Sequence, residues 1–258
     1  MIRILCLGDI VGSPGRSILA ARLPDYRREA KVDLVIANAE NAARGSGLTP
    51  AAYRVIRVAG VDVCTSGDHI FKRSEVTKIF KSDPERLLRP LNYPASAPGR
   101  GATTVETESG VRVAVANVQG RIFTGPADDP FRVLDELYAT LDTKVWVVDV
   151  HAEATSEKRA LGWYLDGRAS IVFGTHTHVP TADEEVLPGG TAYITDVGMC
   201  GPYRSVIGRR TDRVLKKFVT NVNTPFEVAE GDERACGILV EVDPETGKAA
   251  SIERVCLR

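Results

Sequence analysis

The sequence predicts an α/β fold in a single domain that covers residues 1–258. In the first third of the chain, apolar runs of strand character alternate with helical stretches, which is typical of a largely parallel sheet. The middle contains a hairpin pattern and a fully apolar strand, and the last third is mostly β. No tandem repeat, low-complexity tract or proline-rich linker interrupts the chain, so one domain is the simplest organisation.

Three N-terminal units share one plan, in which a short apolar strand is followed by a polar loop and a helix. The expected strands cover residues 3–7, 33–37 and 61–65, and the expected helices cover about 16–30, a stretch from 50 onward, and 73–81. Thr49 suits the N-cap of the second helix because its hydroxyl can accept a backbone N–H, and Pro50 suits the first turn.

The rest of the chain predicts mixed structure. The expected elements are a hairpin of residues 103–108 and 111–118 with a two-residue Ser109-Gly110 turn, a helix at 131–141, a strand at 145–150, a helix at about 157–165, strands at 170–173, 185–187 and 192–195, and a last hairpin of 237–242 with 251–256. Thr155 or Ser156 is expected to cap the helix near 157, with Glu157 favourable at its positive end.

Composition restricts the class of protein. A net charge of −1, with acidic and basic side chains well mixed, argues against an extended nucleic-acid groove and against a polybasic membrane patch. The five cysteines are odd in number and lack CxxC spacing, so we expect no disulfide framework. No signal-peptide pattern and no apolar run of about 18 residues is present, which predicts a cytoplasmic protein that does not enter the membrane.

Ligand-type side chains follow the expected strands. These residues are Asp9, Glu40, Asn41, Asp68, His69, His151, His176 and His178. In open α/β sheets, ligand sites form at the carboxyl ends of strands, so residues from separate strands can converge there. We therefore expect the eight side chains to meet at one edge and to form a two-metal hydrolytic site.

Taken singly, most of these residues have an ordinary structural interpretation. Asp9 can cap a helix or stabilise a turn, Glu40 and Asn41 can be polar loop residues, and His69 can be a loop histidine. The pair His176 and His178 is more specific, because two imidazoles two residues apart after a strand have few structural uses. The glycines of GDIVGSPG lack the Walker spacing and lysine, so a P-loop is rejected.

Several motifs together resemble a known family. GDIVGSPGR, NAENAARGSGL, TSGDH, RPLNYP, DVHAEATSEK, GTHTHVPTAD and TDVGMCGP occur in an order similar to the YmdB-like branch of the calcineurin-like metallophosphoesterases. The resemblance extends from residue 2 to about residue 208. It implies a calcineurin-like metallophosphoesterase sandwich, with two mixed β-sheets flanked by helices. It also implies a phosphodiesterase that acts on 2′,3′-cyclic nucleotides with two metal ions, iron or manganese.

The resemblance further implies a division of the ligands. One metal would be held by Asp9, Glu40, Asn41 and His178. Glu40 would bridge to the second metal, which Asp68, His151 and His176 would also hold. His69 stands where the family places its general acid, a group that would protonate the leaving ribose oxygen while a metal-bridged hydroxide attacks phosphorus.

Asp68 departs from the family pattern, which has asparagine before the catalytic histidine. With two divalent ions, a hydroxide, Asp9 and Glu40, the formal charge of the centre is +1, and Asp68 brings it to zero. We hypothesise that Asp68 favours a harder or trivalent metal and weakens attraction for an anionic substrate.

The primary prediction is therefore a dinuclear phosphodiesterase for small phosphodiester or nucleotide substrates, which could assemble as a homo-oligomer. Two alternatives stay open at this point. The chain could be a metal-binding regulatory or scaffold protein with vestigial hydrolysis, with Asp68 as the motivating departure. It could also be a phosphomonoesterase or a nuclease, although the near-neutral composition weakens the nuclease interpretation.

Overall fold

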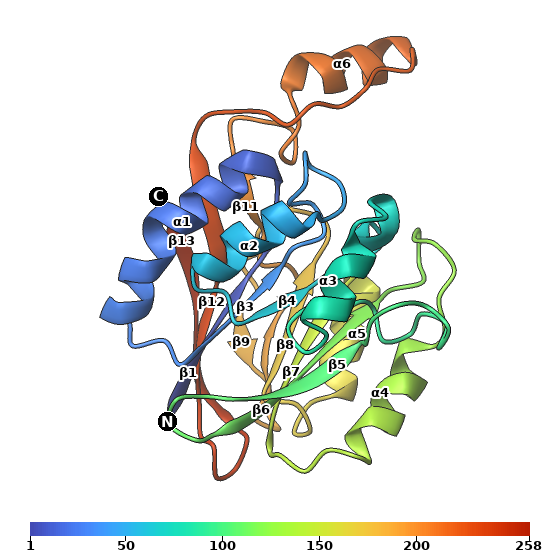
Figure 1. Cartoon of the computed structure of the whole chain (residues 1–258). Helices are drawn as coiled ribbons and strands as arrows, with labels where there is room; N and C mark the ends of the chain where they lie inside the picture. Colours follow the sequence, from blue (N-terminus) through green and yellow to red (C-terminus); the bar gives the residue numbers. More distant parts are fainter.

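Two β-sheets pack face to face in this computed structural model, which describes all residues 1–258 (Figure 1). The first sheet has seven strands in the order β2-β11-β12-β1-β3-β4, and β13 pairs with β12. These strands are β1 (Ile2–Leu7), β2 (Asp9–Ile10), β3 (Leu34–Asn38), β4 (Val63–Thr65), β11 (Met199–Pro202), β12 (Glu233–Val242) and β13 (Ala249–Leu257).

The second sheet has six strands in the order β5-β6-β7-β8-β10-β9. They are β5 (Ala102–Glu106), β6 (Arg112–Gln119), β7 (Val145–His151), β8 (Ile171–Thr175), β9 (Glu185–Val186) and β10 (Ala192–Ile194). The strands β6, β7, β8 and β10 run parallel, as do β1, β3 and β4 of the first sheet. Because each central strand is covered on both faces, β7 is buried along its whole length.

Six α-helices accompany the sheets: α1 (Gly12–Glu29), α2 (Pro50–Val58), α3 (Val76–Ser82), α4 (Pro130–Tyr138), α5 (Thr155–Tyr164) and α6 (Thr211–Thr220). The first three pack on the outer face of the first sheet, and α4 and α5 pack on the outer face of the second. Apolar residues of both inner faces form a shared core, in which Ile4 and Ile36 meet Val147 and Phe173. The expected sandwich of two mixed sheets flanked by helices is confirmed.

Several expected boundaries were wrong. Helix α1 begins at Gly12 rather than near Arg16, since Pro14 lies in its first turn, where no intrahelical N–H is needed. Residues Ile70–Lys72 form a 3₁₀ turn, so α3 starts only at Val76. The first hairpin connection covers residues 107–111, because the ladder ends at the pair Glu106 and Arg112. Helix α5, at residues 155–164, matches the expected helix at about 157–165 closely.

Three elements were not expected from the sequence. The short strands β2 and β11 pair with each other in parallel, with Met199 opposite Asp9. Helix α6 stands away from the two sheets at the top of the molecule, drawn in orange in Figure 1. It ends at Asn221, whose left-handed conformation (φ 55°) closes the helix. No helix in the structure is both long and apolar enough to span a bilayer.

Candidate active site

The carboxyl ends of strands from both sheets meet at one edge and bring all eight expected residues together. Asp9 follows β1, Glu40 and Asn41 follow β3, and Asp68 and His69 follow β4. His151 is the last residue of β7, and His176 and His178 follow β8. Each side chain lies within 4.0 Å of at least one other member of the group. The predicted convergence of these residues is therefore present in the fold.

Four of these residues form a tight cluster. One ligand atom from each of Glu40, Asp68, His151 and His176 lies within 4.8 Å of the others. His151 Nε2 lies 3.3 Å from Glu40 Oε1 and 3.2 Å from Asp68 Oδ1. The Nδ1 atom of His176 lies 3.1 Å from the same His151 nitrogen. A mixed set of carboxylate oxygens and imidazole nitrogens suits a transition-metal ion, so a metal site can form here.

A second group shares Glu40 and surrounds Asp9. His178 Nε2 lies 3.7 Å from Asp9 Oδ1 and 3.3 Å from the amide nitrogen of Asn41. Asp9 Oδ1 is fully buried and has no hydrogen-bond partner, whereas Asp9 Oδ2 accepts the backbone N–H of His176 at 3.0 Å. A buried carboxylate oxygen without a partner is costly, and a cation between Asp9 and His178 would satisfy it. The residues present therefore fit a metal at this second position as well.

The imidazoles are held by groups outside the cluster, which fixes the nitrogen that each presents. His178 Nδ1 donates to the carbonyl oxygen of Ile207 at 2.9 Å, so Nε2 faces Asp9. His151 Nδ1 lies 2.9 Å from the Thr175 hydroxyl. His176 turns Nδ1 to the cluster because its Nε2 pairs with Glu153 at 3.2 Å. Such outer partners orient metal ligands and set their tautomers.

The buried carboxyl group of Asp149 holds Thr175, the residue whose hydroxyl lies beside His151 Nδ1. The Thr175 hydroxyl donates to Asp149 Oδ1 at 2.8 Å, and the Thr65 hydroxyl donates to Asp149 Oδ2. Burial raises the pKa of Asp149 to about 7, despite the opposing effects of His151 and the two hydroxyl groups. The side chain of Asn38 adds a donor to Asp149 Oδ2 at 3.3 Å. This network fixes the position of Thr175 and hence of the His151 ring.

Charge in the cluster is balanced between carboxylates and imidazoles. Burial would raise the pKa of Asp68, but hydrogen bonds from His151 and His176 hold it well below its usual range. Burial likewise opposes ionisation of Glu40 and His151, yet their mutual attraction lowers the pKa of Glu40 and raises that of His151 well above its ordinary value. The anionic oxygens are therefore available as ligands, while a metal would have to displace the protons held by imidazole.

The backbone that carries His176 and His178 is strained. Their φ angles are 99° and 65°, a region that residues other than glycine rarely adopt. Thr177, between them, is fixed by Asp196, whose Oδ2 accepts the Thr177 N–H at 3.1 Å and its hydroxyl at 2.8 Å. Asp196 Oδ1 accepts the N–H of Gly198 at 2.8 Å. The strain lies where two neighbouring side chains must both point into the centre.

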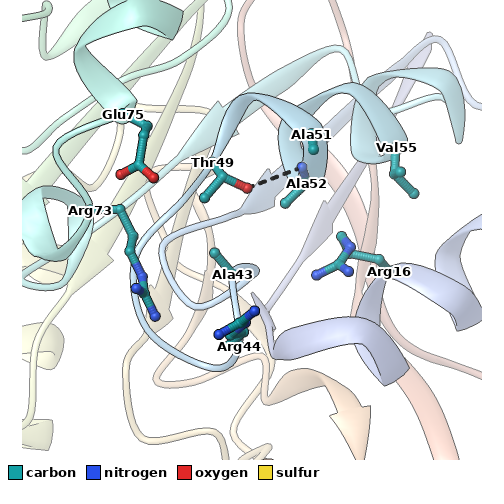
Figure 2. A pocket seen from close by; sticks show the side chains of 9 residues that line it. All are labelled: Arg16, Ala43, Arg44, Thr49, Ala51, Ala52, Val55, Arg73 and Glu75. Carbon is teal, nitrogen blue, oxygen red and sulfur yellow. Dashed lines mark hydrogen bonds between the residues drawn. The ribbon is translucent and has the colours of Figure 1, made fainter.

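Arginine side chains hold the loop that follows Glu40 and Asn41. Arg16 donates to the carbonyl oxygen of Ala42, and Arg209 donates to that of Gly45. Arg73 reaches the carbonyl of Ser46 at 3.4 Å. Figure 2 shows Arg16 and Arg73 entering a pocket of about 540 Å³ from opposite sides of this loop, beside the Thr49 cap of α2. The expected Thr49 cap and the first-turn Pro50 are confirmed.

His69 borders the cluster and the open cavity. Its Nδ1 lies 2.7 Å from Asn41 Oδ1, and its backbone N–H donates to Glu40 Oε2 at 2.9 Å. Its Nε2 lies 3.5 Å from Asp68 Oδ2. The cavity beside it measures about 470 Å³ and is also lined by His176 and His178. A ligand in this cavity would therefore lie against His69 and the cluster together.

Some supporting residues were not found from the sequence. Glu153 lies in the HAEATSEK motif, but its pairing with His176 depends on the tertiary fold.

The cap expected at Thr155 or Ser156 is wrong, because α5 begins at Thr155 after Ala154 without a side-chain cap. Glu157 lies in the first turn of α5, as expected, and also accepts the backbone N–H groups of Arg121 and Ile122. Gly67 is required because a Cβ there would overlap the His151 ring. In the sequence, the glycine of the TSGDH motif could have indicated that another side chain approaches the backbone closely at this position.

Comparison with known proteins assigns the chain to a family. The family model described as YmdB-like protein matches residues 5–255. The chain is 47% identical to the 2′,3′-cyclic-nucleotide 2′-phosphodiesterase of Bacillus subtilis (strain 168), over 99% of this chain and 97% of that protein.

Two solved structures share this fold throughout. The crystal structure of a hypothetical protein from Thermus thermophilus has a TM-score of 0.93 at 46% identity, covering 99% of this chain and 98% of that one. A structure described as a novel phosphatase from Mycoplasma pneumoniae also has a TM-score of 0.93, at 37% identity, over 99% of this chain and 92% of that chain. With a family model that covers nearly the whole sequence and relatives that match it end to end, the chain belongs to the YmdB-like protein family.

Proposed function

We propose that this chain is a metal-dependent phosphodiesterase that hydrolyses nucleoside 2′,3′-cyclic phosphates at the 2′ oxygen. The observation that carries the proposal is the convergence of Glu40, Asp68, His151 and His176 beside the buried, unpartnered oxygen of Asp9. The name of the Bacillus subtilis relative supports the choice of substrate. Hydrolysis joins a water oxygen to phosphorus and breaks the bond from phosphorus to the ribose 2′ oxygen, which gains a proton.

We assign two metal sites that share Glu40, with iron or manganese as the metals. Asp9, Glu40, Asn41 and His178 would hold the first ion. Glu40, Asp68, His151 and His176 would hold the second. Bound cations of this kind polarise the phosphoryl group and lower the pKa of the attacking water.

The chain's own groups orient the ligands and deliver the proton. The Ile207 carbonyl, Thr175 and Glu153 hold the three imidazoles at fixed nitrogens. His69 is proposed as the general acid, because its ring lies at the border between the cluster and the cavity. A donated proton neutralises the 2′ alkoxide as it leaves, which typically accelerates such a step by about 10²–10⁴-fold.

Asn41 links the first site to His69. Its amide nitrogen lies beside His178, and its oxygen lies beside His69 Nδ1. As placed, Asn41 Oδ1 can accept a hydrogen bond from the Nδ1–H of a protonated His69, which leaves the Nε2 proton of that imidazolium free for transfer to the leaving oxygen.

Turnover of adenosine 2′,3′-cyclic phosphate by metal-loaded protein tests the proposal. The expected product is adenosine 3′-phosphate, with activity lost in chelator and restored by manganese or iron. Elemental analysis should give two metal ions per chain. Release of adenosine 2′-phosphate would contradict the assigned bond, and full activity with one ion per chain would contradict the dinuclear assignment.

A phosphomonoesterase activity is the second candidate, favoured by the name of the Mycoplasma pneumoniae structure. Hydrolysis of adenosine 3′-phosphate faster than of the cyclic phosphate would support that alternative. No turnover of either ester by metal-loaded protein would instead support a metal-binding regulatory role.

A further inference from the structure

The cavity beside His69 has two chemically different ends. One end is formed by the ring of His69 with those of His176 and His178. The other, apolar end is formed by Val214 and Phe218 of α6 and by Phe226 after it, while Val206, Ile207 and Arg209, which precede the helix, also line the cavity. The cavity volume of about 470 Å³ falls in the range of small-molecule sites. A ligand that fills it must therefore present a polar group to one end and an apolar group to the other.

We propose that the apolar end of this cavity binds the nucleobase of the substrate, with the rings of Phe218 and Phe226 as its stacking partners. This assignment rests on the proposed function, because a cyclic nucleotide carries its phosphodiester and its aromatic base at opposite ends of one ribose. With the phosphoryl group at the polar end, the base extends toward the apolar wall of the same cavity.

The position of α6 supports this assignment. Val214 and Phe218 are four residues apart and so lie on one face of the helix. Val214 is buried and anchors that face, whereas Phe218 is 76% exposed although it lines the cavity. Phe226, after the helix, is 44% exposed. A flat base that binds against these aromatic rings would remove their apolar surface from water. That burial favours binding.

The same wall predicts weak discrimination among bases. Its valine, isoleucine and phenyl side chains have no donors or acceptors to read the edge of a base, and the guanidinium of Arg209, which also lines the cavity, donates to the carbonyl of Gly45. Stacking tolerates every base because each has a π-face, and larger rings cover more area. We therefore expect all four nucleoside cyclic phosphates to be accepted, with purines bound more tightly than pyrimidines.

The test compares a substrate that has a base with one that lacks it. Phe218→Ala, Phe226→Ala and the double variant are assayed on adenosine 2′,3′-cyclic phosphate and on 1-O-methylribose 2′,3′-cyclic phosphate. Val219→Ala is the matched control, because Val219 lies on the same helix, is 81% exposed and does not line the cavity. Loss of one ring should lower kcat/KM on the adenosine substrate about tenfold, mainly through KM. The base-free substrate and the Val219 variant should change less than about twofold.

Binding of adenosine alone gives a readout that needs no turnover. Saturation-transfer NMR should detect contact of adenosine with the wild-type protein and lose it in the double variant. Equal losses of kcat/KM on both substrates would overturn the base site. A smaller oligomer in light scattering, with no change in the ratio between the substrates, would overturn it too and indicate contact with a second copy. If wild-type protein hydrolyses neither cyclic phosphate, the proposed function fails, and adenosine binding alone decides the base site.

Discussion

The ammonium group of Lys158 lies 2.7 Å from Asp196 Oδ2, and both side chains are about 1% exposed. Lys158 is on α5, whereas Asp196 follows β10 and holds Thr177 between the two strained histidines. One ion pair thus fixes the backbone of two proposed metal ligands. The pair is buried with hydrogen bonds to Asp196 from Thr177 and Gly198, so few of its polar atoms lack partners.

Asp196→Ala is expected to destabilise the fold and weaken metal binding together. It leaves the Lys158 charge buried without its partner, which typically costs about 3–5 kcal/mol. It also releases Thr177, so His176 and His178 lose their fixed positions. Urea unfolding of chelated protein measures the first effect, and calorimetric titration with manganese measures the second. Arg132→Ala, which removes the exposed pair with Glu136, is the control and should change neither. Unchanged manganese affinity in Asp196→Ala would show that the ion pair supports the fold alone.

His176→Ala and His178→Ala should each lose metal and activity in parallel, because each imidazole is assigned to a different ion. We expect at least a 100-fold fall in turnover, since even partners outside the ligand sphere typically account for about 10–100-fold. Elemental analysis and turnover of the same preparations provide the measurement. Wild-type turnover in either variant would contradict the ligand assignment.

His69→Ala should keep its metal and lose activity in a way that depends on the leaving group. A ribose alkoxide needs a proton as it departs, so its release should slow by about 10²–10⁴-fold. A nitrophenolate leaves without a proton, so hydrolysis of bis(p-nitrophenyl) phosphate should change little. Equal losses on the two substrates would indicate that His69 positions the phosphate instead of donating a proton.

Asp68→Asn tests the effect of the additional carboxylate. Asp68 Oδ1 lies 3.2 Å from His151 Nε2 and 3.5 Å from His176 Nδ1, within the cluster. Asparagine keeps an oxygen ligand and removes one negative charge, so phosphodiesters should bind more tightly and preference should shift toward divalent metals. Inhibition by inorganic phosphate and metal competition measure these shifts. Identical metal content and kinetics would exclude residue 68 from the metal site. A sharp rise from near-zero turnover would favour a regulatory role for the native protein.

Removal of metal should lower thermal stability, because a ligand bound only by the folded state stabilises it. At a metal concentration about 100-fold above Kd, this stabilisation is about 2.7 kcal/mol, or roughly 5–10 °C in Tm for a chain of this size. Differential scanning calorimetry with and without chelator, at constant pH, is the measurement. His178→Ala is the control and should show a smaller difference. No change in wild-type Tm would mean that the cluster holds no ion in the folded protein.

The convergence of the eight candidate residues could be predicted because each of them ends or follows an apolar strand. Asp9, Glu40 and His151 each end or follow an apolar strand, and parallel strands place those ends at one edge. The outer partners could not be predicted in this way. Glu153 reaches His176, and Asp196 reaches Thr177, only through the packing of segments that are distant in sequence.

Local sequence patterns also failed to predict elements that pair with a segment distant in sequence, or whose apolar residues are mostly exposed. The two-residue strand β2 exists because it pairs with β11, about 190 residues later. Helix α6 buries Val214 but leaves Leu215, Phe218 and Val219 in solvent, so most of its apolar residues do not mark a core face. Prediction from periodicity assumes that apolar faces are buried, and α6 does not meet that assumption.

The position of β12 has a consequence for how the protein is made. This strand, Glu233–Val242, lies between β11 and β1 in the first sheet, although it follows β1 by more than 200 residues in the chain. During synthesis β1 therefore lacks its neighbour on one side until more than 200 residues have followed it, and Asp9 lacks the β11 pairing that positions it. Contacts of such long sequence separation form slowly. A nascent chain stalled before residue 233 would carry every proposed ligand and still lack a complete first sheet, so assembly of the metal centre is expected to await the C-terminal hairpin.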